Sequence, residues 1–367
     1  FRNRPWFYTV TIETMTSMQH KFGALDLIRA GLQDLDKART LFDELHNDGI
    51  DDDRMRLLLT TLEKACDPDV ALSNLVDIIK VVQSQGEDFT NIIADENSFI
   101  RLITVLGVSD EMGKLMRFRP ELVEAAANDA CESHLYNHEQ RRAHVLKSVG
   151  ADPNDHTMPT ASLPLAEAAT ALRKTYRKQL AAIMAQDATA NDPITIQPRI
   201  STELSDLADA ALEGALAIAR HEVDGSEHVR FAIIGMGKLG AQELNYVSDV
   251  DLIYVVEPAD ADTNGMTLSR VGTKMATTLQ RVCQSVIMGV AEPTLWQIDG
   301  GLRPEGKDGP LVRKLESHEA YYEQWAENWE FQALLKARPV AGDPDLGQAY
   351  MDMTRPFVWT ASKRDNF

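Results

Sequence analysis

Cysteine is scarce in this chain, and long apolar runs are missing. The 367 residues include only Cys66, Cys131 and Cys283, which lie far apart. An odd number of widely spaced cysteines argues against a disulfide framework or a zinc site and is typical of reduced thiols. No apolar run approaches the roughly 18 residues that a membrane helix needs, and the N-terminal residues do not resemble a signal peptide. We therefore expect a cytoplasmic protein that does not contact a membrane.

Positive charge is also in deficit. The chain has 37 lysines and arginines against 56 aspartates and glutamates, for a formal net charge of -19. Proteins bind the phosphate backbone of nucleic acids through lysine and arginine, so this balance argues against DNA or RNA as a partner. The hydrophobic content of 44% is that of an ordinary folded protein, and the length allows two or more domains.

The most informative stretch is 231–258, FAIIGMGKLGAQELNYVSDVDLIYVVEP. Its two apolar runs, 231–236 and 252–256, are short and rich in Ile and Val, which predicts two buried strands. Side chains alternate along a strand, so Asp249 and Asp251 should point to the same face. Two neighbouring carboxylates repel each other unless a cation lies between them. A divalent cation such as Mg²⁺, with Mn²⁺ as a second choice, is therefore expected here together with phosphate oxygens.

A dinucleotide-binding site is an alternative interpretation of the same stretch. The glycines of 235–240 match G-x-G-x-x-G, and Glu257 stands where a ribose-binding acid belongs, as in a Rossmann-type oxidoreductase. However, that fold needs a crossover of about a dozen residues, whereas 241–248 allow only about two helical turns. A Walker A loop is excluded because no Ser or Thr follows Lys238. A catalytically silent regulatory module is a third hypothesis, against which the acidic residues argue.

The segments on either side of this stretch carry apolar residues at helical spacing. The patterns predict a helical region up to residue 150, a proline-containing linker at 150–164, and later helices at about 165–186, 200–220, 268–286 and 317–336.

Three further expectations concern particular side chains on these helices. Tyr321, Trp325 and Trp329 follow one another at helical spacing, which predicts that they belong to the core. The basic run of 173–178 is interpreted as a solvated helix face. His134, His138 and His144 lie among polar residues, where solvated histidines are favoured over a metal site.

The string GMGKLGAQELNYVSDVDLIYV resembles the signature of the glutamine synthetase adenylyltransferase/adenylyl-removing family, within the DNA-polymerase-β-like nucleotidyltransferases. The resemblance continues through TLWQIDGGLRPEGKDGPLV and WEFQALLKARPVAGD, so it covers 231–343. The superfamily has Gly-Gly or Gly-Ser before its Asp-x-Asp motif, whereas this chain has Gly240-Ala241. The resemblance implies an α+β fold, with a helical N-terminal region followed by a polymerase-β-like nucleotidyltransferase domain built on a small mixed sheet flanked by helices.

The resemblance also implies a division into domains. We expect a helical region at 1–150, a linker and long helix at 151–200, the catalytic domain at 201–343, and the start of a following helical domain at 344–367. The family enzyme carries two copies of the motif set and this chain has one, so it is interpreted as a fragment of a larger bifunctional enzyme.

The site implied by the resemblance contains three acids. Asp249 and Asp251 would be joined by Asp299, on a strand predicted at 294–302, as catalytic and metal-binding residues. The glycine-rich turn and the loop 303–310 suit phosphate, because Arg gives bidentate contacts and Lys a point charge. The residues expected to bind nucleotide or phosphate are Gly237, Lys238, Gly240, Ala241, Ser248, Arg303, Lys307 and Arg338.

Several of these assignments have alternatives. Lys238 could instead have a structural role in the turn, and 303–310 could be a surface turn with a salt bridge. Glu330, Lys336 and Arg338 could contact nucleotide or form an internal ion-pair network.

The family enzyme uses one module to move AMP from ATP to a tyrosine of glutamine synthetase and another to remove it by phosphorolysis, which yields ADP. The strings DPDVALSNLV, LITVLGVSDEMGKLM and LRKTYRKQLAAIMAQD resemble the removing module. We therefore expect deadenylylation of glutamine synthetase, with ATP or ADP and phosphate as small-molecule partners and a PII-type signal protein as regulator. Adenylylation remains the alternative, because both modules share Asp-x-Asp.

Overall fold

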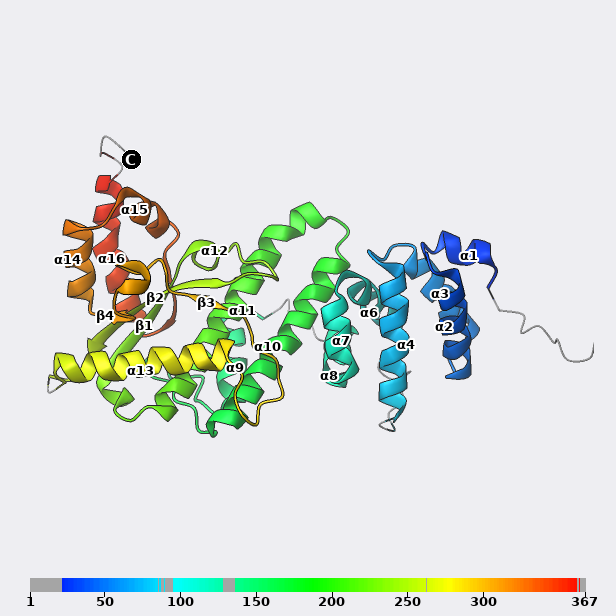
Figure 1. Ribbon diagram of the computed structural model, residues 1–367, viewed down its shortest axis with the longest axis horizontal. Coiled ribbons are helices and arrows are strands. Elements are labelled where there is room, and N and C mark those ends of the chain that lie inside the picture. Colours follow the sequence, from blue (N-terminus) through cyan, green and yellow to red (C-terminus); the bar gives the residue numbers. More distant parts are fainter. Residues whose placement is uncertain are drawn as a thin grey trace, which may run out of the picture. The chain divides into compact units, whose positions relative to one another are not determined.

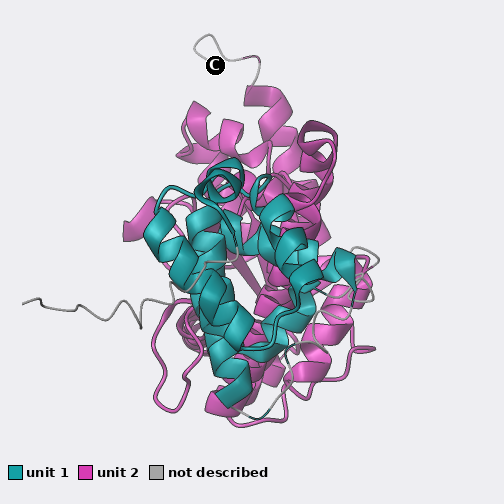
Figure 2. Ribbon diagram, turned by 90° about the vertical axis from the view of Figure 1, so that its right-hand side faces the viewer, with its two compact units in different colours: residues 1–127 teal, residues 128–367 magenta. Residues whose placement is uncertain are grey.

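The computed structural model describes residues 22–84, 86, 89, 95–127, 136–261, 263–361 and 363. The chain forms two compact units, Phe1–Ala127 and Asn128–Phe367 (Figure 2). Of the residues discussed above, Cys131 and His134 lie outside the described residues, while Cys66 and Cys283 are free thiols. No helix in the described ranges is long and apolar enough to cross a membrane.

The described part of the first unit is helical. Its helices pack through apolar stripes of the predicted kind, and four of them begin at an aspartate or serine whose side chain accepts a bond from the first turn (Asp34, Asp51, Asp95 and Ser109). The helices are α1 (Ala24–Arg29), α2 (Leu35–Asn47), α3 (Asp52–Leu62), α4 (Pro68–Ser84), α6 (Glu96–Val108), α7 (Asp110–Arg117) and α8 (Pro120–Ala127).

The second unit begins with three helices that pack on one another, α9 (His138–Ser148), α10 (Leu165–Ala188) and α11 (Pro193–Glu222). Asp192 caps α11, and Pro193 occupies its first position, where a missing N–H costs nothing. Residues 200–220 of α11 carry small and apolar side chains that are largely buried, so α11 forms the base of the unit's core.

The sheet contains β1 (Val229–Gly235), β2 (Val250–Pro258), β3 (Ile298–Asp299), β4 (Val312–Arg313) and β5 (Arg338–Gly342). β1 pairs antiparallel with both β2 and β5, whereas β3 and β4 pair parallel with β2, so the sheet is mixed. The strand predicted at 294–302 is shorter than expected and comprises only Ile298–Asp299.

Both faces of the sheet are covered by helices (Figure 1). One face packs against α11 and α13 (Gly265–Gln284), and the other against α14 (Leu315–Gln324), α15 (Asn328–Leu334) and α16 (Pro344–Ala361). Alternate residues of β1 accordingly enter two different cores, Phe231 and Ile233 on one side and Ala232 and Ile234 on the other. This explains why β1 is apolar throughout, and it confirms the expected α+β class.

The prediction of a single helix at 317–336 is wrong, because this segment forms two helices. α14 ends at Gln324, and α15 begins after Glu327, whose side chain forms a capping box with Glu330. The break turns Trp325 and Trp329 outward, with exposed fractions of 73% and 50%, so they are not core residues as predicted.

The basic run on α10 is a solvated face only in part, because Lys174 and Lys178 are exposed whereas Arg173 and Arg177 are buried. Arg173 is 1% exposed and donates to the carbonyl oxygens of Val282, Ser285 and Glu292. Arg177 is also buried and donates to the carbonyl of Thr294. Because buried guanidinium groups need hydrogen-bond acceptors, these contacts tie α10 to the segment that leads into β3.

Candidate functional site

The glycine-rich stretch forms a tight turn between β1 and β2, closed by the single-turn helix α12 (Gly237–Gly240). The Met236 N–H donates to the carbonyl of Asp251 at 2.8 Å, which fixes the turn to the start of β2. Gly237 has φ +54°, and a side chain there would overlap Asp251 Oδ2. A residue without Cβ is therefore required at Gly237 for the turn to lie against this carboxylate.

Asp251 and Asp299 are directly opposite each other in the parallel register of β2 and β3. Since neighbouring strands lie about 4.8 Å apart and opposite residues share a face, the two side chains are neighbours. The Gly301 N–H donates to Asp299 Oδ1 at 2.7 Å and orients that carboxylate. Asp249, which is exposed, comes just before β2.

The pKa of Asp251 reflects this arrangement. Burial raises it above its usual value, the charges of Asp249 and Asp299 raise it further, and the charge of Lys238 lowers it. The structure thus brings Asp249, Asp299 and Lys238 close enough to Asp251 to influence its pKa, and a cluster of carboxylates is the charge distribution expected of a cation site.

The other predicted residues of the turn have defined contacts. Lys238 is exposed, and its Nζ lies 3.4 Å from Ser248 Oγ. The N–H groups of Gly240 and Ala241 donate within the turn, to the carbonyls of Met236 and Gly237. A side chain on Gly240 would overlap the carbonyl oxygen of Lys336, so Gly240 permits close packing of two backbone segments.

The loop after β3 is organised by Arg303. This side chain donates to the carbonyls of Gly300 at 2.6 Å, Lys307 at 3.1 Å and Gly309 at 3.2 Å. Arg303 therefore closes its own loop. Lys307 lies exposed in the 3₁₀ turn Gly306–Asp308.

Arg338, Lys336 and Glu330 all take part in contacts within the protein. Arg338 forms a bidentate ion pair with Asp209 at 2.6 and 3.2 Å, and it also donates to the carbonyl of Gly240. Lys336 pairs with Glu243 at 2.6 Å, while Glu330 accepts from Tyr321 and from the Glu327 N–H. Such contacts are the ones expected if Glu330, Lys336 and Arg338 form an internal network, which was the alternative to nucleotide binding.

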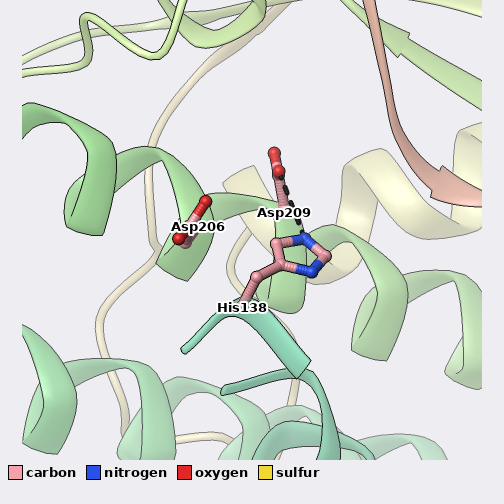
Figure 3. A group of neighbouring side chains, drawn as sticks. All are labelled: His138, Asp206 and Asp209. Carbon is pink, nitrogen blue, oxygen red and sulfur yellow. Dashed lines mark ion pairs between the residues drawn. The ribbon is translucent and has the colours of Figure 1, made fainter. Parts of the chain in front are cut away.

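A second group of ionisable residues lies beside this site and was missed from the sequence. His138 opens α9 and points towards Asp206 and Asp209 of α11 (Figure 3). One potential ligand atom of each lies within 4.8 Å of the others, so the group could hold a metal ion. Its only signal in the sequence is a pair of acids three residues apart on a helix that is otherwise largely apolar.

The charges of this second group are coupled. A hydrogen bond to Asp209 raises the pKa of His138, and burial raises the pKa of Asp206. His138 is thus not simply solvated, as the sequence suggested. His144 contacts Tyr136, with ring centroids 4.5 Å apart and the ring planes tilted by 58°, and burial lowers the pKa of His144.

Known proteins are similar to this chain over most of its length. The family model described as glutamate-ammonia ligase adenylyltransferase matches residues 99–353. The bifunctional glutamine synthetase adenylyltransferase/adenylyl-removing enzyme of Bifidobacterium longum strain DJO10A is 74% identical over 353 residues, which cover 96% of this chain and 33% of the relative. The enzyme of the same name from Cutibacterium acnes is 39% identical over 344 residues, covering 94% and 34%.

The chain spans about a third of the length of the curated relatives that it matches. The names of these relatives describe nucleotidyltransferases. The dinucleotide-binding alternative is not supported, because β1 and β2 are antiparallel and are joined through a single helical turn instead of a crossover helix. The fold and the relatives agree, and the chain belongs to the glutamate-ammonia ligase adenylyltransferase family.

Proposed function

We propose that this chain is the adenylyl-removing module of such an enzyme and splits AMP from an adenylylated tyrosine of glutamine synthetase by phosphorolysis. The observation that carries the proposal is the register of β2 and β3, which sets Asp251 beside Asp299 with Asp249 close by. The direction of the reaction rests on the segments 67–76, 102–116 and 172–187, which resemble the removing module, and the names of the relatives include that activity.

The donor set suits a hard divalent cation, Mg²⁺ or Mn²⁺. All three side chains offer carboxylate oxygens, the ligands that such ions prefer. Gly237 has no side chain, which lets the turn backbone lie directly against Asp251. Asp249, Asp251 and Asp299 would hold the cation, which when bound supplies neutralising charge for phosphoryl oxygens.

The remaining residues would bind and orient the reactants. In the proposed reaction an oxygen of hydrogen phosphate attacks the adenylyl phosphorus, and the bond from that phosphorus to the tyrosine oxygen breaks. ADP and tyrosine form, and the proton of hydrogen phosphate passes to the tyrosine oxygen. Lys238, steadied by Ser248, and Lys307 are the exposed cations that would neutralise phosphate oxygens. We assign Arg303 to shaping the loop, because it donates to three carbonyls there.

The partners follow from the same proposal. Glutamine synthetase is the protein substrate, phosphate and ADP are the small molecules, and a PII-type signal protein is the regulator. Glutamine synthetase is named by the relatives, whereas the regulator rests on the family resemblance alone.

The test is a phosphorolysis assay. The chain is incubated with adenylylated glutamine synthetase, and ADP is measured with and without phosphate and Mg²⁺. Release should require both, and Asp249→Asn should abolish it. The matched control Asp224→Asn, which removes an exposed carboxylate from the loop before β1, should remain active. Full activity of Asp249→Asn would refute the assignment of the acids.

A chain that catalysed the opposite reaction, the adenylylation of glutamine synthetase, would give different results. If the chain were an adenylyltransferase, labelled AMP would pass from ATP to unmodified glutamine synthetase, and adding phosphate to the adenylylated protein would release no ADP. That pair of results would overturn the proposed direction while leaving the site intact.

A further inference from the structure

The guanidinium group of Arg338 lies between α11 and the end of α12. Its two terminal nitrogens bind the two carboxylate oxygens of Asp209, at 2.6 and 3.2 Å. The same side chain donates to the carbonyls of Leu239 at 3.1 Å and Gly240 at 3.3 Å. The last carbonyls of a helix lack partners within the helix, so a cation placed there satisfies them and fixes the helix end.

Asp209 provides the anchor for this contact. Its side chain is completely buried on α11, and a buried carboxylate is tolerated only when cations and donors surround it. Arg338 supplies a cation. His138 Nε2 lies 3.5 Å from Asp209, at the edge of a pocket of about 180 Å³ that Asp209 also lines, and the hydrogen bond to Asp209 raises the pKa of His138. Asp209 is thus contacted by donors from two sides.

A second, weaker contact joins the same two elements. Gln242 follows α12 and has φ +56°, a conformation that is uncommon for a residue with a side chain. Its Nε2 donates to Asp206 at 3.2 Å, one turn before Asp209 on α11. α11 therefore holds the region of α12 at two points, through Arg338 and through Gln242.

The same contacts weigh against a metal ion at His138, Asp206 and Asp209. Both oxygens of Asp209 already bind Arg338, and a divalent cation on Asp209 would lie close to the fixed charge of the guanidinium group. Like charges at such a separation repel strongly in a buried setting. The geometry favours a structural connection over an ion site.

We propose that Arg338 and Asp209 are positioning residues, which place the α12 turn against Asp251, and that His138 and Gln242 support them. The expected effect on turnover rests on the proposed function, whereas the placement of the α12 turn by Arg338 and Asp209 does not. Arg338 does not touch the reactants in this scheme. Its loss should misplace Gly237 against Asp251, so turnover should fall. The apparent affinity for phosphate should be kept through Lys307, which lies on a separate loop.

The kinetic test separates positioning from phosphate binding. We expect Arg338→Ala to lower kcat for phosphorolysis about 100-fold, with the KM for phosphate within twofold of wild type. Arg338→Lys keeps a charge for Asp209 but lacks the fork that reaches Leu239 and Gly240, so it should recover only part of kcat. Gln242→Ala, a mild change that leaves the ion pair in place, should lower kcat several-fold. A rise in the KM for phosphate with unchanged kcat would instead make Arg338 a phosphate ligand and overturn the inference.

A second readout does not depend on activity. Amide hydrogen exchange of 237–243 should become at least tenfold faster in Arg338→Ala and in Gln242→Ala, while β1 and β2 stay protected. The control Arg199→Ala removes an exposed arginine that pairs with Glu203 on the same helix α11, and it should change neither exchange nor kcat. Unchanged exchange in both test variants would refute positioning. Faster exchange in the two variants, combined with no phosphorolysis by the wild-type chain, would instead refute only the proposed function.

The metal alternative is tested directly with Mn²⁺ and Zn²⁺. Calorimetry compares the binding of each ion to Asp251→Asn and to Asp251→Asn/His138→Ala. The two proteins should bind the ion equally, because we expect no ion at His138. Binding lost on that substitution would show that the three residues form a metal site and would overturn the inference.

Discussion

Replacing Asp251 by asparagine should stabilise the protein in the absence of divalent cations and make it less responsive to them. The perturbation removes a charge and almost nothing else, because asparagine has the same shape. Asp251 is half-buried, and burial together with the charges of Asp249 and Asp299 raises its pKa. Its ionised form is therefore disfavoured in the folded state, where three carboxylates gather, and the neutral amide relieves that repulsion.

The magnitude follows from the spacing of the strands. Two unit charges about 5 Å apart repel by about 3 kcal/mol at an effective dielectric constant of about 20. Lys238 offsets part of this, and solvent screens the exposed Asp249, which reduces the net gain to about 1 kcal/mol. In a unit of this size that gain corresponds to a rise in Tm of about 2–4 °C.

The assay is calorimetry of wild type, Asp251→Asn and the control Asp224→Asn, each in EDTA and in Mg²⁺. An ion at a hundred times its Kd stabilises a binding protein by about 2.7 kcal/mol, and the variant should show less than a third of that effect. A lower Tm for Asp251→Asn in EDTA, or equal Mg²⁺ shifts in all three proteins, would refute the reasoning.

Three further predictions concern other parts of the catalytic unit. Asp299→Ala should reduce phosphorolysis at least 100-fold while calorimetry still detects ADP binding, and an active variant would remove Asp299 from the site. Gly240→Ala should cost more than about 3 kcal/mol in urea unfolding, because its methyl group meets backbone oxygens, whereas Gly265→Ala, in open space, should stay within about 0.5 kcal/mol. Burial lowers the pKa of His318 from 6.5 to about 3, so the unfolded chain takes up the proton first. The contribution of His318 is complete above pH 6.5 and is lost as the pH falls towards 3, and the loss has reached about 2 kcal/mol at pH 5. His318→Gln should lose correspondingly less stability between pH 7 and pH 5, and an equal loss would contradict the pKa.

Local patterns were sufficient where the structure is decided by neighbours in the chain. The two apolar runs predicted β1 and β2 because both faces of the sheet are buried, and the spacing of Asp249 and Asp251 predicted their shared face. Asp299 could be identified only through the family motif, since nothing near it in the sequence indicates that β3 pairs with β2 in register.

Long-range contacts were not predictable in the same way. Arg338 has the residue type of a phosphate ligand, but it binds Asp209, 129 residues earlier in the chain. Arg173 lies in a basic run, yet its acceptors are backbone carbonyls more than 100 residues later. The aromatic residues of 321–329 kept a helical period across a helix break, and the capping pair Glu327 and Glu330 is the local feature that would have indicated it.

The attachment of α10 to the segment before β3 has a consequence for sequence variation. Arg173 and Arg177 bind carbonyl oxygens, which every amino acid provides, instead of particular side chains. The exposed side chains between Val282 and Thr294 are therefore free to change without loosening the attachment. Val286 and Met288, about 90% exposed, are examples, whereas Cys283 and Ile287 belong to the core and Gln284 accepts from the Ile298 N–H. This segment can diversify its outer surface between related proteins while the strand bearing Asp299 keeps its place.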